Sequence, residues 1–65
     1  MSKIIEQLKT IMRYKGISQV MLAERTGLTE TTISRYMNGT REPSLSNLEK
    51  MAKAVGCKVV LIDEI

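Results

Sequence analysis

Hydrophobic residues recur along the chain at steps of three and four positions, in four separate stretches. This is the period of an α-helix with one apolar face, and it predicts helices over residues 3–14, 19–26, 30–37 and 45–55. The first stretch is the clearest. Its inward positions are Ile4, Ile5, Leu8, Ile11 and Met12. We therefore expect a mainly α, compact four-helix domain.

Residues suited to helix ends stand between these stretches. Ser18 and Thr29 precede the second and third helices, where a side-chain oxygen can accept from a free backbone N–H. The fourth helix has two candidate starts, because Ser44 could cap it directly or Ser46 could form a capping box with Glu49. Residues 38–43 are polar, end in proline and predict a loop. Helices often end at a left-handed glycine, and each periodic stretch is followed by one: Gly16, Gly27, Gly39 and Gly56.

The last eight residues, KVVLIDEI, break the helical period. They contain β-branched residues and lack a preceding N-cap, so we predict a strand over residues 58–65 that follows a domain of residues 1–57. A lone edge strand leaves its backbone unpaired, and pairing with the same strand of a second chain would satisfy it. A frayed tail or a short helix on the same chain is the alternative. The expected dimer interface is Val59, Val60, Leu61 and Ile62.

Residues 18–43 have the spacing of two short helices joined by a sharp turn. Ala23 is small where the helices would touch, Gly27 stands where the chain reverses, and Leu28 and Ile33 follow at core spacing. On these residues the chain resembles the helix-turn-helix domains of the lambda and 434 repressors and Cro. The resemblance covers residues 3–57 and extends to Ile17-Ser18-Gln19, Leu22-Ala23, Ile33-Ser34-Arg35, Asn38-Gly39, Pro43-Ser44-Leu45 and Leu48-Met51-Ala52. It implies a lambda-repressor-like fold that binds double-stranded DNA as a dimer on a palindromic operator.

One departure from this family concerns two methionines. Similar proteins carry an Arg on the first helix that pairs with a Glu before the Asn-Gly, and this chain has Met12 and Met37 at those places. Replacing a buried ion pair by packed apolar groups is often neutral or stabilising. We therefore predict that Met12 and Met37 touch, although methionine also fills gaps independently.

The resemblance implies that the helix over residues 30–37 enters the major groove of DNA. With Ile33, Tyr36 and Met37 inward, its outward face supplies the expected base contacts. These are Glu30, Thr31, Ser34 and Arg35. Arg35 is the strongest, because a guanidinium can bond bidentately to guanine, although it could instead pair with a nearby acid. Glu30 could accept from a cytosine amine or only favour the positive end of the helix.

Other polar residues are expected to contact phosphates of the DNA backbone. Such contacts orient the protein on the duplex without specifying the base sequence. Gln19 opens the second helix, and the resemblance implies that it meets the DNA backbone. Asn38-Gly39 could also be a simple helix stop, and Arg41 a solvated loop charge. The full set is Gln19, Thr29, Thr32, Asn38, Thr40 and Arg41.

Charge and composition agree with a polyanionic partner. The net charge is +3, and residues 1–57 hold nine Lys/Arg against five Asp/Glu. We expect no enzyme, metal or cofactor, because the chain has no His, one Cys and no glycine-rich phosphate loop. Cys57 as the only cysteine, a charged start and the short apolar runs predict a cytoplasmic protein without a membrane partner.

The sequence thus favours a transcriptional regulator, a repressor from a bacterium or phage. The alternative is an antitoxin that binds a toxin protein and regulates its own operon. Val20 and Met21, apolar at the exposed start of the second helix, point to such a protein-binding surface. Neighbouring genes, or a second protein that co-purifies, would separate the two functions.

Overall fold

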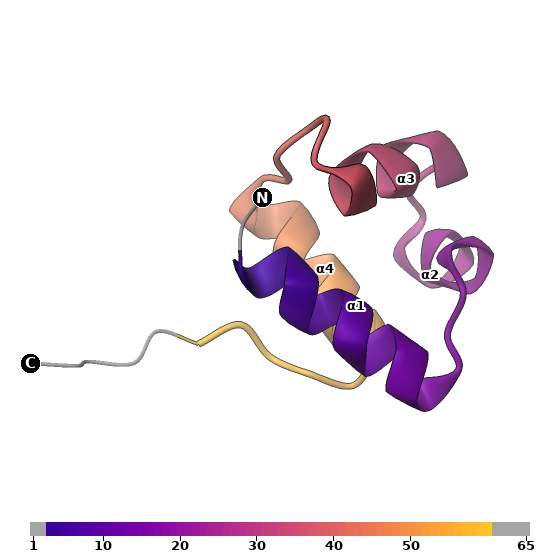
Figure 1. Ribbon diagram of the computed structural model, residues 1–65, viewed down its shortest axis with the longest axis vertical. Helices are drawn as coiled ribbons and strands as arrows, with labels where there is room; N and C mark the ends of the chain where they lie inside the picture. Colours follow the sequence, from indigo (N-terminus) through magenta and orange to yellow (C-terminus); the bar gives the residue numbers. More distant parts are fainter. Residues whose placement is uncertain (1–2, 61–65) are drawn as a thin grey trace, which may run out of the picture.

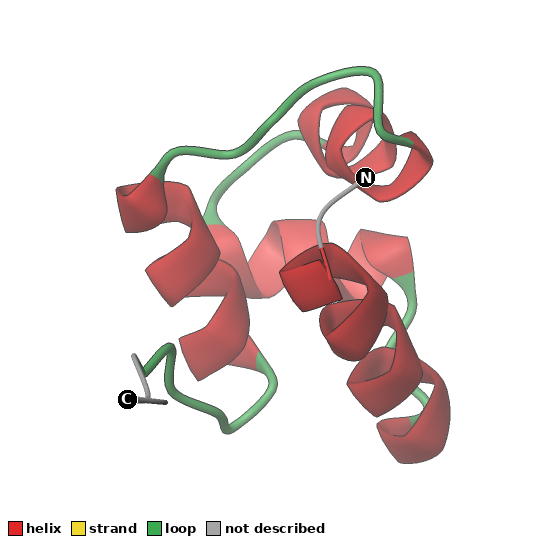
Figure 2. Cartoon of the chain, turned by 60° about the vertical axis from the view of Figure 1, so that its left-hand side comes forward, coloured by secondary structure: helices red, strands yellow, loops and turns green. Residues whose placement is uncertain are grey.

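The computed structural model describes residues 3–60, and its regular structure there is entirely helical (Figures 1 and 2). The four helices are α1 (Lys3–Lys15), α2 (Gln19–Thr26), α3 (Glu30–Asn38) and α4 (Leu45–Ala54). The predicted helices are confirmed, with three carboxyl ends displaced by one residue. α2 packs against α3 and α4, and α1 packs against α3.

Polar caps start three of the helices. The hydroxyl oxygens of Ser18, Thr29 and Ser44 each accept from a backbone N–H three residues later, at 3.1 Å. Such a cap typically stabilises a helix by about 1 kcal/mol. Ser44, and not Ser46, is therefore the cap of α4. The four predicted glycine stops are also confirmed, because all four have positive φ angles.

The core lies where the inward faces of the four helices meet. Its most deeply buried side chains are no more than 2% exposed, and they are Ile5, Leu22, Ile33, Met51 and Val55. Met12 and Met37 are buried in the same cluster, but their direct contact stays a prediction. Within residues 3–60 no buried side chain is charged, and the hydroxyl of Tyr36 is the polar group that the buried side chains carry.

Two cations hold the carboxyl end of α4. Lys15 Nζ, at the end of α1, donates to the carbonyl of Val55 at 2.6 Å. Arg25 Nη1, from α2, donates to the carbonyl of Ala54 at 3.1 Å. Positive charge at a helix carboxyl end is favourable, because the last carbonyls lack helical partners. These contacts tie α1 and α2 to α4.

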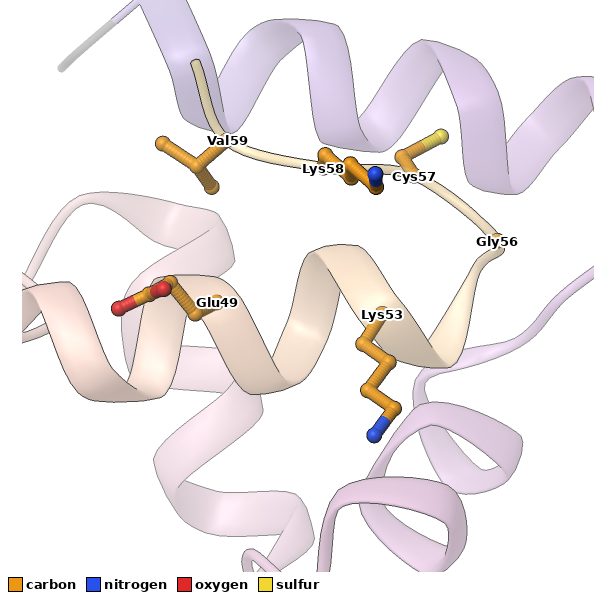
Figure 3. Close-up of a pocket in the computed structure, with 6 residues that line it drawn as sticks. All are labelled: Glu49, Lys53, Gly56, Cys57, Lys58 and Val59. Carbon is orange, nitrogen blue, oxygen red and sulfur yellow. The ribbon is translucent and has the colours of Figure 1, made fainter.

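The tail turns back at Gly56 and runs beside α4 in the opposite direction (Figure 3). Glu49 and Lys53 on α4 and Lys58 and Val59 on the tail line a shallow depression between them. Residues 58–60 form neither strand nor helix, so the prediction of a strand is not met in this part of the tail. The rest of the predicted strand, 61–65, lies outside the described residues.

The physical reason is a missing partner for the tail backbone. A strand exists through hydrogen bonds to a neighbouring strand. Among the described residues, no hydrogen bond involves the backbone N–H or C=O of residues 58–60. A single copy of the described chain therefore offers no ladder for the tail to join.

Candidate nucleic-acid interface

The turn between α2 and α3 is fixed by local hydrogen bonds. Gly27 has φ +77°, and its N–H donates to the carbonyl of Ala23 at 2.9 Å. The hydroxyl of Thr26 donates to the carbonyl of Leu22 at 2.8 Å and accepts from the N–H of Leu28 at 3.2 Å. Because Ala23 is buried and small, the two helices can approach closely at this corner. The pair therefore forms a rigid unit.

The outward face of α3 follows from what its other face buries. Ile33, Tyr36 and Met37 are at most 4% exposed. The four predicted base-contacting residues are all exposed on the opposite face. They line one shallow depression together with the first residue of α2, and its lining is Gln19, Glu30, Thr31, Ser34 and Arg35. The structure thus brings the expected reading residues together with one expected phosphate contact.

The Arg35 guanidinium is free to meet a ligand. It has no side-chain hydrogen bond or ion pair within residues 3–60, where the one ion pair joins Lys9 and Glu6. The alternative in which Arg35 pairs with a neighbouring acid is therefore not seen in the described part of the chain.

A polar contact fixes α3 to α4 from behind. The amide nitrogen Nδ2 of Asn47 donates to the Tyr36 hydroxyl at 2.8 Å. Tyr36 is only 3% exposed, and Asn47 is half-buried in the first turn of α4. This bond holds the inner side of α3, and with it the orientation of the outward face.

A second group of expected phosphate contacts lies at the carboxyl end of α3 and in the loop after it. The side-chain oxygen of Asn38 accepts from the backbone N–H of Thr40 at 2.9 Å and also from the Thr40 hydroxyl. Asn38 therefore organises the loop, while Arg41 is exposed and has no side-chain partner among the described residues. None of these three residues lines the depression on α3.

Thr29 and Thr32 contact each other at the start of α3. The Thr29 hydroxyl donates to the Thr32 hydroxyl at 2.9 Å and accepts from its N–H. This capping role accounts for both residues within the fold, and their contact with phosphate stays a prediction.

Two basic residues of α1, which no sequence pattern marks as functional, lie beside the start of α2. Lys9 and Arg13 line a further depression whose other lining residues are Met12, Ile17, Ser18, Gln19 and Met37. Arg13 stands on the polar side of the predicted first helix, five positions before Ser18. No sequence motif marks it, because its relation to α2 and α3 is spatial.

Residues 3–60 contain no group of three side chains that could hold a metal ion. No helix in this range is long and apolar enough to cross a bilayer.

Two helices joined by a fixed turn, with an exposed polar face on the second, define a helix-turn-helix DNA-binding domain. Residues 8–62 match the helix-turn-helix family, and the chain belongs to its Cro-type members, which are DNA-binding transcriptional regulators and not enzymes.

Two curated relatives show what kinds of protein carry similar domains. The chain is 38% identical over 58 residues to an uncharacterized HTH-type transcriptional regulator, y4dL, of Sinorhizobium fredii. The alignment covers 89% of this chain and 30% of the relative. It is 27% identical over 63 residues to antitoxin HigA1 of Mycobacterium tuberculosis. That alignment covers 97% of this chain and 42% of the relative. The chain thus spans less than half the length of either relative. No solved structure matches the chain significantly.

Proposed function

We propose that this domain is a sequence-specific repressor that reads the major groove of DNA with α3. The observation that carries the proposal is the depression in which Glu30, Thr31, Ser34 and Arg35 gather beside Gln19. The major groove is about 12 Å wide and admits an α-helix, and its base edges offer distinct hydrogen-bond patterns. Such a regulator would act in the cytoplasm of a bacterium.

Arg35 and Arg41 have different roles in this proposal. Arg35 lies on the outward face of α3 formed by Glu30, Thr31, Ser34 and Arg35, which we call the reading face. Its guanidinium is expected to bond to a guanine edge, which would give preference at one base pair. Arg41 lies in the loop after α3, where an exposed cation suits a phosphate. The excess of basic over acidic side chains in residues 1–57 supports binding to a polyanion.

A dimer would give the affinity that one helix-turn-helix unit lacks. We infer that residues 58–65 of two copies pair antiparallel across a two-fold axis. Dimers of helix-turn-helix domains generally bind half-sites about 34 Å apart, and we expect the same spacing here. Among residues 3–60, the backbone of residues 58–60 has no hydrogen-bond partner, and this supports the inference. The apolar side chains expected at the contact are those of Val59, Val60, Leu61 and Ile62.

The test separates the two arginines on DNA selected from random duplexes. Arg35→Ala should relax preference at one base pair, at a cost of about 1–3 kcal/mol on the selected site. Arg41→Ala should weaken binding to selected and scrambled duplexes alike and lower the salt slope by about 0.9. Fluorescence anisotropy at several salt concentrations measures both effects. Identical behaviour of the two variants on both duplexes would show that this division of roles is wrong.

An antitoxin is the second candidate, and the similarity to HigA1 favours it. Val20, 47% exposed at the start of α2, is an apolar side chain that a protein partner could cover. Co-expression with the neighbouring genes tests this function. A second protein that co-purifies with the wild type but not with Val20→Asp would support it, and purification of the domain alone would count against it.

A further inference from the structure

We propose that Lys9 and Arg13, at the carboxyl half of α1, form an additional contact for a phosphate of the DNA backbone. This inference rests on the proposed function, since the phosphate belongs to the duplex that α3 reads. The two side chains line one depression with Ser18 and Gln19, where α2 begins. Nothing in the sequence pattern assigned a role to either residue.

The position of this depression connects it to the reading face. Gln19 lines both the depression of Lys9 and Arg13 and the depression on the outward face of α3. Met37, near the carboxyl end of α3, also lines the first of them. The two surfaces therefore meet at Gln19, so a duplex bound against α3 would pass beside α1.

The charge of the depression suits an anion. Its seven lining residues include two cations and no carboxylate, whereas the reading face contains Glu30. Arg13 is exposed and makes no side-chain hydrogen bond or ion pair within residues 3–60. A guanidinium is well shaped for two parallel hydrogen bonds to a phosphate.

Lys9 is available as well, because its present partner is weakly held. Lys9 Nζ lies 3.4 Å from a carboxylate oxygen of Glu6, and the two side chains are 32% and 60% exposed. Pairs of this kind at a surface contribute little stability, because solvent screens them. A phosphate can replace the carboxylate without disturbing α1.

Salt-dependent binding provides the test. Each phosphate contact contributes about 0.9 to the slope of log affinity against log salt. Arg13→Ala should bind selected and scrambled duplexes more weakly at 50 mM salt, by the same factor for both. Its deficit relative to the wild type should shrink about threefold between 50 and 200 mM salt. Arg13→Lys should retain most of the slope, because it keeps the charge.

Lys53→Ala is the matched control, since Lys53 is an exposed cation on α4 that lines the depression under the tail (Figure 3). It should leave the slope unchanged. Equal slopes for Arg13→Ala and the wild type would overturn the inference, as would a loss confined to one DNA sequence. If the proposed function itself is wrong, the wild type will bind no duplex at any salt concentration. That result differs from a wild type that binds DNA with the same salt slope as Arg13→Ala. Circular dichroism melting confirms that each variant is folded.

Discussion

The hydrogen bond between Tyr36 and Asn47 offers a direct test of how α3 is held. The bond is 2.8 Å long and joins the inner side of α3 to α4. Tyr36→Phe removes the hydroxyl and leaves the buried ring in place, so it creates almost no cavity. Asn47→Ala removes the donor, while the backbone N–H of residue 47 still bonds to Ser44.

The expected magnitude follows from the burial of the two groups. A neutral hydrogen bond inside a protein contributes about 0.5–1.5 kcal/mol net. Because Asn47 is only half-buried, water can reach part of its amide, and we expect Tyr36→Phe to cost about 1 kcal/mol. In a domain of this size that loss lowers the melting temperature by about 4–8 °C.

The assay is urea unfolding of the wild type, both single variants and the double variant. If the two groups act through one shared bond, the double variant loses less stability than the sum of the single losses, by about 1 kcal/mol. A difference below about 0.3 kcal/mol lies within the additivity expected of independent sites and would refute the reasoning. Arg41→Ala, in the exposed loop, is a control that should change stability little.

Two further changes address the turn and the tail. Gly27→Ala should destabilise the domain by about 1–2 kcal/mol in thermal melting, because its φ is +77° while no atom lies near the added Cβ. Gly16→Ala, equally open at φ +70°, should cost the same, and a much larger loss at Gly27 would reveal a steric role instead. Val60→Asp should shift dimer to monomer in sedimentation, since Val60 is 66% exposed in one copy. Leu45→Asp, at a site 64% exposed on α4, should not, and a dimer that survives Val60→Asp would refute tail pairing.

The helices could be predicted from the sequence because their signals are local. An apolar period of three to four residues, a Ser or Thr before it and a Gly after it act within a few positions. The reading face was predictable for the same reason. Once Ile33, Tyr36 and Met37 are placed inward, the remaining side chains of the helix must point out. The ends of α1, α3 and α4 differ by one residue, since terminal turns have few bonds to define them.

The contacts between distant positions could not be predicted. Lys15 reaches Val55 across forty positions, and Arg25 reaches Ala54 across twenty-nine, and neither pair has a spacing that marks it. Whether Arg35 pairs with an acid also depends on its surroundings in space. The strand could not be established from one chain, because hydrophobic alternation cannot supply the neighbouring backbone that a strand requires.

The absence of buried charge within residues 3–60 has a consequence for how the domain responds to its surroundings. Dissolved ions act mainly on groups that water reaches, and here those groups lie on the outside of an apolar interior. A rise in ionic strength would therefore lower the affinity of the domain for DNA without unfolding the domain. Under the proposed function, release from DNA at high salt would then be reversible, because the fold does not depend on buried charges.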